Sequence, residues 1–144
     1  MKKRIFLCLL AAVLAISLCV SQTRRQAAEE RLRQLPDFYA ALADQPDFVS
    51  IRIAPEGAFL HLTDGTLQPV TLPDALIALL NRPWYAADGL RMVYKQGDDV
   101  YFVTGADVDD RFGYVVTSDA SVCMEGLVTL ERVENGVFRF STRK

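Results

Sequence analysis

The stretch FVSIRIAPEGAFLHLTDG, residues 48–65, decides the fold of this 144-residue chain. Apolar side chains alternate with other side chains on both sides of the turn-forming APEG, a pattern typical of two half-buried strands joined as a hairpin. Asp64-Gly65 predicts a second tight turn. The side chains expected to face the core are Val49, Ile51 and Ile53 in the first strand, and Ala58, Leu60 and Leu62 in the second.

The residues that follow predict an edge strand and then a helix. LQPVTL, residues 67–72, contains Pro69, which cannot donate to a strand ladder and therefore favours an edge or a bulge. PDALIALLN, residues 73–81, predicts the one internal helix, with Pro73 in its first turn and an end before Arg82-Pro83. Its leucines and isoleucine cover most of its circumference, so we expect this helix to be largely buried.

The second half of the chain predicts about five more strands, and the last hairpin can be given a register. A two-residue Asn135-Gly136 turn would place Arg132 opposite Arg139, which is unfavourable because like charges repel. A three-residue loop that ends in a left-handed Gly136 instead sets Glu131 opposite Arg139 and Leu130 opposite Phe140. We predict the second register, and an α+β domain over residues 47–144 with a mostly antiparallel sheet and one packed internal helix.

Residues 1–23 predict a transmembrane signal anchor. Nineteen residues without a charge, Ile5 to Thr23, separate Arg4 from Arg24, and as a helix they span about 28 Å, close to the hydrocarbon thickness of a membrane. The basic residues before the run favour a cytoplasmic N-terminus, which places the domain outside the cytoplasm of a bacterial cell as a single-pass protein. A cleaved signal peptide with Cys19 and Ser21 at the −3 and −1 positions, followed by secretion, is the alternative. A lipoprotein at Cys19 is disfavoured by Leu18.

Residues 24–46 predict a membrane-proximal helical segment. Apolar side chains recur there in a 4-3-4-3 rhythm that is typical of a coiled-coil seam, at Ala28, Leu32, Leu35, Tyr39 and Leu42. We expect Pro36 to interrupt this rhythm and to begin a second short helix that ends before Pro46. One interpretation is a dimerising stalk. The favoured one is that Leu35, Phe38, Tyr39 and Leu42 lay one face of the helix onto the sheet.

Charge and cysteine content exclude several classes of function. Residues 1–45 carry seven basic and four acidic side chains, whereas residues 46–144 carry nine and fourteen. An acidic domain disfavours nucleic acid as a partner, because phosphate binding needs clustered Lys and Arg. Cys123 is the one cysteine of the domain, so no disulfide can form within it, and it serves either as a small buried hydrophobe or as an exposed reactive thiol.

The sequence offers no set of residues for catalysis, a metal or a cofactor. His61 is the only histidine, and strand alternation points it away from the core beside Phe59. No Ser or Cys lies in a nucleophile motif, and no glycine-rich loop opens a helix. The acidic loop that holds Asp107, Asp109 and Asp110 lacks the glycine and glutamate of a calcium loop, so a solvated loop with Arg111 as an internal partner is favoured.

Trp84 and Tyr85 are the candidate binding residues. They follow the internal helix directly, and Trp84 is the only tryptophan. An aromatic pair in a loop either closes the end of the core or anchors a ligand or partner. We therefore expect a membrane-anchored extracytoplasmic interaction or ligand-sensing module that is not an enzyme, with a protein partner or self-association. The alternative is a structural or assembly subunit of a membrane-associated complex.

Overall fold

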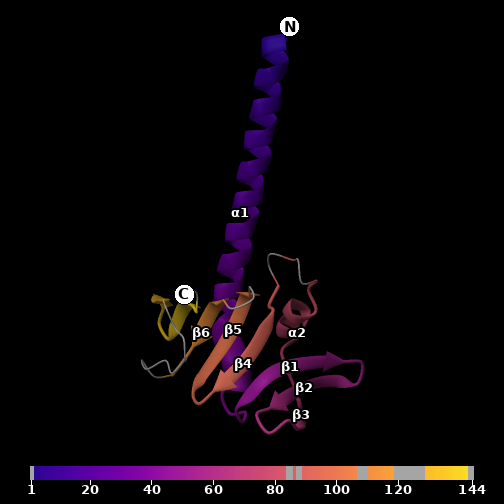
Figure 1. Cartoon of the computed structure of the whole chain (residues 1–144), viewed down its shortest axis with the longest axis vertical. Coiled ribbons are helices and arrows are strands. Elements are labelled where there is room, and N and C mark those ends of the chain that lie inside the picture. Colours follow the sequence, from indigo (N-terminus) through magenta and orange to yellow (C-terminus); the bar gives the residue numbers. More distant parts are fainter. Residues whose placement is uncertain (1, 84–85, 87–88, 107–109, 119–128, 143–144) are drawn as a thin grey trace. The chain divides into compact units, whose positions relative to one another are not determined.

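The computed structural model describes residues 2–83, 86, 89–106, 110–118 and 129–142. The chain divides into two compact units, residues 1–33 and 34–144. Helix α1 runs through the first unit and ends in the second, and the remaining elements all belong to the second (Figure 1). The elements are α1 (Lys2–Leu42), β1 (Phe48–Ala54), β2 (Gly57–Leu62), β3 (Leu67–Val70), α2 (Asp74–Leu80), β4 (Met92–Gln96), β5 (Asp99–Ala106), β6 (Arg111–Val116), β7 (Thr129–Glu134) and β8 (Val137–Ser141).

The eight strands form one open antiparallel sheet in the order β3-β2-β1-β4-β5-β6-β8-β7. This confirms the predicted α+β class and the mostly antiparallel sheet. Strand β3 lies at one edge, as its proline predicts, since Pro69 pairs with Phe59 of β2 on one side only. Strand β7 forms the other edge.

The first hairpin forms where the alternation predicts it, but the start of its first strand is out of phase. Ala58 and Leu60 of β2 are buried, as expected. Val49 of β1 is 43% exposed, and the core residue is Phe48, which is 1% exposed. The register shifts between Phe48 and Ser50, so Val49 is the extra residue of a β-bulge. The prediction that Val49 faces the core is therefore wrong, because period-2 alternation fails across a bulge.

The last hairpin confirms the predicted register. Leu130 pairs with Phe140 and Glu131 with Arg139, whose guanidinium lies 3.5 Å from the Glu131 carboxylate. Gly136 has a φ of 73°, the left-handed conformation that was expected of it. The loop itself differs from the prediction. Glu134 pairs with Val137 across a two-residue turn, and the extra residue is a bulge between Arg132 and Glu134.

Helix α1 passes through Pro36 without interruption, so the prediction of a second helix that begins there is wrong. An internal proline normally disfavours a helix because it lacks the N–H and its ring meets the carbonyl one turn earlier. Here side chains on both sides of Pro36 are buried in the second unit: Leu35, Phe38 and Leu42 are 0%, 1% and 0% exposed. This packing holds the helix together, and it confirms that this stretch lays one face onto the sheet.

Two other helix predictions are corrected or unconfirmed. Helix α2 is not largely buried, because Leu76 is its one fully buried residue and Ile77, Leu79 and Leu80 are half-buried. Pro73 occupies the N-cap position before the helix. Within the residues described, no helix combines the length and the apolar character needed to cross a membrane. The transmembrane role predicted for residues 1–23 is therefore not confirmed.

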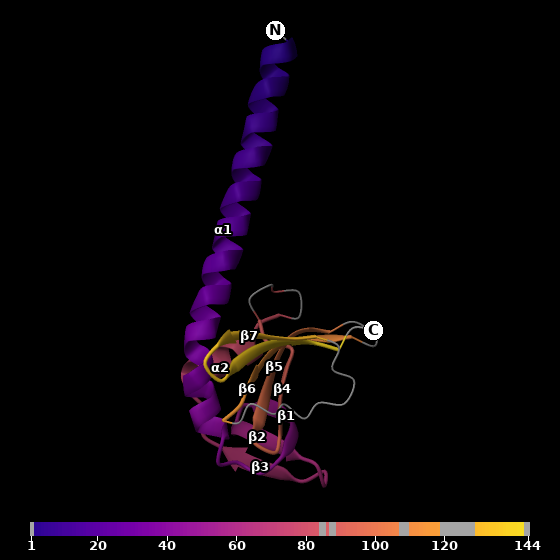
Figure 2. The ribbon, with the colours of Figure 1, turned by 90° about the vertical axis from the view of Figure 1, so that its left-hand side faces the viewer.

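Residues 100–103 of β5 and residues 113–116 of β6 are buried on both faces of the sheet. On the first face Phe102 meets Phe38 of α1, with ring centroids 6.2 Å apart, and Figure 2 shows the last turns of α1 along this side of the sheet. Strand alternation places Tyr101 and Val103 on the opposite face. There they form a buried cluster with Val115 and Phe140.

Candidate functional site

Most of the residues that the sequence singles out lie outside the described part of the chain. These are Trp84, Tyr85, Asp107, Asp109 and Cys123. Asp110 is described and half-buried. His61 is half-buried on β2, where it pairs with Ser50 and Leu67 of the neighbouring strands. Among the described residues no group of three or more His, Cys, Asp or Glu side chains could hold a metal ion.

A hollow with polar and apolar walls lies where β1 meets β4. These two strands share a single registered pair, Phe48 with Lys95, whereas β4 and β5 share five. The strands therefore diverge beyond that pair and leave a cleft of about 460 Å³, which we name the seam cleft. Its lining residues are Asp47, Phe48, Val49, Thr63, Met92, Tyr94, Lys95, Gln96 and Arg111.

Asp47 ties the end of the α1–β1 connection to the β4–β5 hairpin. Its Oδ1 accepts a hydrogen bond of 2.9 Å from the Gly97 N–H and lies 3.7 Å from Nζ of Lys95. Lys95 is only 8% exposed, and a buried ammonium is costly unless a charge of opposite sign accompanies it. The Asp47 carboxylate supplies that charge. One cation of the seam cleft is thus compensated within the protein.

The second cation, Arg111, lies over an aromatic stack. Its guanidinium carbon is 5.9 Å from the centroid of the Tyr94 ring. Tyr94 stacks on Tyr101 with centroids 4.6 Å apart and planes 6° apart, and Tyr101 meets Phe140 edge-on at 5.6 Å. Tyr101 and Phe140 are fully buried, so the Tyr94 ring packs against the core of the domain. The guanidinium of Arg111 makes a cation–π contact with this ring.

The pKa of the Tyr94 phenol depends on its burial and on Arg111. Burial raises the pKa of Tyr94 above its ordinary value of 10.0, while the hydrogen bond and positive charge of Arg111 oppose that rise. The folded state thus holds the phenol proton more tightly than the unfolded state. The resulting stability is present below the unfolded pKa and is lost as the pH rises through the folded one.

We predict that Arg111→Gln raises the pKa of Tyr94 further, because it removes the charge that favours the phenolate. The measurement is an alkaline titration of the Tyr94 ring signals by NMR. Arg139→Gln is the matched control, since Arg139 lies on β8 and pairs with Glu131 at the far edge of the sheet. An unchanged or lowered Tyr94 pKa in Arg111→Gln would show that the two side chains do not interact.

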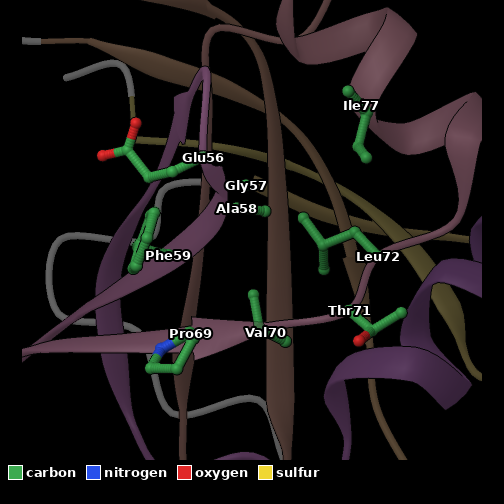
Figure 3. A pocket seen from close by; sticks show the side chains of 9 residues that line it. All are labelled: Glu56, Gly57, Ala58, Phe59, Pro69, Val70, Thr71, Leu72 and Ile77. Carbon is green, nitrogen blue, oxygen red and sulfur yellow. The ribbon is translucent and has the colours of Figure 1, made fainter.

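A second hollow lies between the β2–β3 edge and α2, and we name it the edge groove. It has a volume of about 430 Å³. Figure 3 shows Ala58, Val70, Leu72 and Ile77 converging on it, while the carboxylate of Glu56 points away from that group. Thr71 also lines the groove, which therefore offers apolar contact and a hydroxyl group but no cation. The seam cleft is the better candidate, because ligand sites combine apolar walls with a few placed polar groups.

Sequence reasoning missed both Tyr94 and Arg111 as site residues. Tyr94 sits in an ordinary strand pattern, and Arg111 was expected to pair with the acidic loop that precedes it. The structure places the Arg111 guanidinium over Tyr94, two strands away in the sheet. The pairing depends on the register of β4, β5 and β6, and no local sequence signal marks it.

Known proteins supply no further indication of a site. Comparisons with protein-family models, curated proteins and solved structures found no match.

Proposed function

We propose that this chain is a membrane-anchored extracytoplasmic module that binds a ligand or partner and catalyses no reaction. The observation that carries the proposal is the surface of the N-terminal segment. Its large apolar side chains are exposed to between 46% and 63%, namely Leu10, Val13, Leu14, Ile16, Leu18 and Val20. A soluble helix would present such side chains along one stripe only.

These side chains cover more than half of the helix circumference, and Ala11, Ala12, Ala15 and Cys19 occupy the rest. At about 100° per residue, Leu14 and Leu18 lie on one side, and Ile16 and Val20 point to another side. Val13 lies close to Val20, and Leu10 lies between the two groups. A helix that is apolar all round is stable only within an apolar environment. The nineteen uncharged residues from Ile5 to Thr23 supply about the length that a bilayer needs, which supports an anchor.

The seam cleft supports binding as the activity of the domain. Its lining combines apolar side chains with two cations. Lys95 is paired with Asp47, and Arg111 lies over the Tyr94 ring. The alternative, a structural or assembly subunit built on a helical stalk, has less support. Leu35 and Leu42, two of the five residues of the expected seam, are fully buried within the second unit and leave no continuous apolar stripe for a partner helix.

We predict that the full chain expressed in a bacterial host is recovered uncleaved in the membrane fraction and is digested by protease added outside the cytoplasmic membrane. Leu14→Arg should move a large part of it out of the membrane, because an arginine at the centre of a spanning helix costs about 3 kcal/mol. Leu14→Ala is the matched control and should stay in the membrane.

Two results would contradict the anchor. One is a full-length protein in the soluble fraction, and the other is a shorter soluble species that begins near Gln22. Mass spectrometry of the purified protein separates these outcomes. Protection of the domain from external protease would contradict the extracytoplasmic placement.

A further inference from the structure

We propose that the seam cleft binds a small organic ligand through a carboxylate and that Arg111 is the residue that holds this carboxylate. The inference rests on the proposed binding function and names the ligand class for it.

The charges of the cleft single out Arg111. Lys95 has Asp47 as its counter-charge. The exposed Arg111 has the Tyr94 ring beneath its guanidinium. An arginine that stacks on an aromatic ring still has the N–H groups around the edge of its plane, and these match the two oxygens of a carboxylate.

Arg111 has contacts at its backbone and at its tip. At its backbone, the Arg111 N–H donates to Oγ1 of Thr142 at 2.7 Å, and the Thr142 N–H donates to the Arg111 carbonyl at 2.8 Å. At its tip, the stack of Tyr94 on Tyr101 fixes the ring under the charge. A donor that is ordered before binding loses less side-chain entropy when the ligand arrives.

The rest of the cleft suits the body of such a ligand. Val49 is 43% exposed because the bulge of β1 turns it outward, and together with Met92 it gives the lining an apolar part. Thr63 and Gln96 add neutral polar groups. A volume of about 460 Å³ lies within the range typical of small-molecule sites.

The surroundings argue against a merely non-specific attraction of anions. Residues 46–144 carry five more acidic than basic side chains, so the field of the domain as a whole repels an anion. Binding of a carboxylate must therefore come from local contacts. It should depend on the one guanidinium rather than on the total number of basic residues.

The test uses benzoate and its neutral analogue benzamide, titrated against the full chain in detergent micelles and followed by NMR. Benzoate should bind saturably, and Arg111→Gln should raise its Kd by about tenfold or more, since a charge-assisted bidentate contact contributes at least that much. Arg111→Lys should give an intermediate loss, because it keeps the charge and removes the fork. Arg139→Gln should leave the Kd unchanged.

Three results would overturn the proposal: equal binding of benzoate and benzamide, equal benzoate binding by wild type and Arg111→Gln, or no saturable benzoate binding by wild type. A weaker affinity of Arg111→Gln for benzoate supports the proposal only if the backbone NMR spectrum of this variant keeps the native dispersion. If the spectrum does not, the benzoate Kd of Arg111→Lys is compared with that of the wild type instead. None of these results affects membrane fractionation, so failure of the ligand class is distinguishable from failure of the anchored module.

Discussion

Phe38→Ala is expected to lower the free energy of unfolding of the domain by about 3–5 kcal/mol, the usual cost of removing a buried aromatic ring. Phe38 is 1% exposed, and its ring meets that of Phe102 at 6.2 Å with a tilt of 42°. Phe102 is itself fully buried in the central strand β5. Truncation therefore leaves a cavity between the last turns of α1 and the middle of the sheet. Denaturant unfolding of the full chain, followed by circular dichroism, measures the loss.

Pro36→Ala is the control in the same helix. Pro36 is exposed and contributes no buried surface, so its replacement restores a backbone N–H to the helix at no packing cost. We expect the stability of this variant to be unchanged or increased. A loss of stability in Pro36→Ala as large as that in Phe38→Ala would show that Pro36 itself, and not the packing of Phe38, supports the sheet.

Gly113→Ala is expected to cost about 3 kcal/mol or more, because its added methyl group has no space. A Cβ at Gly113 would overlap the carbonyl oxygen of Phe102 and lie 2.9 Å from Cα of Val103. Both are backbone atoms of β5, at the point where the register with β6 shifts beyond Val103. They cannot yield without moving the central strand, so the whole β5–β6 pairing carries the strain.

Gly97→Ala separates this steric effect from the general cost of replacing a glycine. Gly97 has a φ of +60° and nothing within 4 Å of an added Cβ. Its replacement should cost only about 1 kcal/mol, the penalty of a left-handed conformation for an alanine. Equal losses in the two variants, measured by denaturant unfolding, would show that Gly113 is needed for its flexibility and not for the close approach of β5.

Local chemistry explains why some elements could be predicted. The charges of Glu131, Arg132 and Arg139 and the left-handed preference of Gly136 set the register of the last hairpin, because both effects act between neighbours in sequence. The edge position of β3 could be predicted from Pro69 alone, because the missing N–H is a property of the proline residue itself.

Other features depended on residues far apart in the sequence. Alternation could not reveal the bulge that turns Val49 outward, nor the packing of Leu35, Phe38 and Leu42 that carries α1 through Pro36. The predicted binding pair, Trp84 and Tyr85, lies outside the described residues and stays a prediction. The site that the structure does offer was missed, because Arg111 and Tyr94 are seventeen positions apart.

The sequence by itself determined the α+β class, the antiparallel hairpins and the edge strand. Each follows from the periodicity or the conformational preference of adjacent residues. Only the tertiary structure decided where β1 and β4 diverge. The two strands share a single registered pair, Phe48 with Lys95. That divergence opens the seam cleft, and the registers of β4, β5 and β6 bring Arg111 over Tyr94. Contacts of this kind arise from the packing of the whole sheet, which no local pattern encodes.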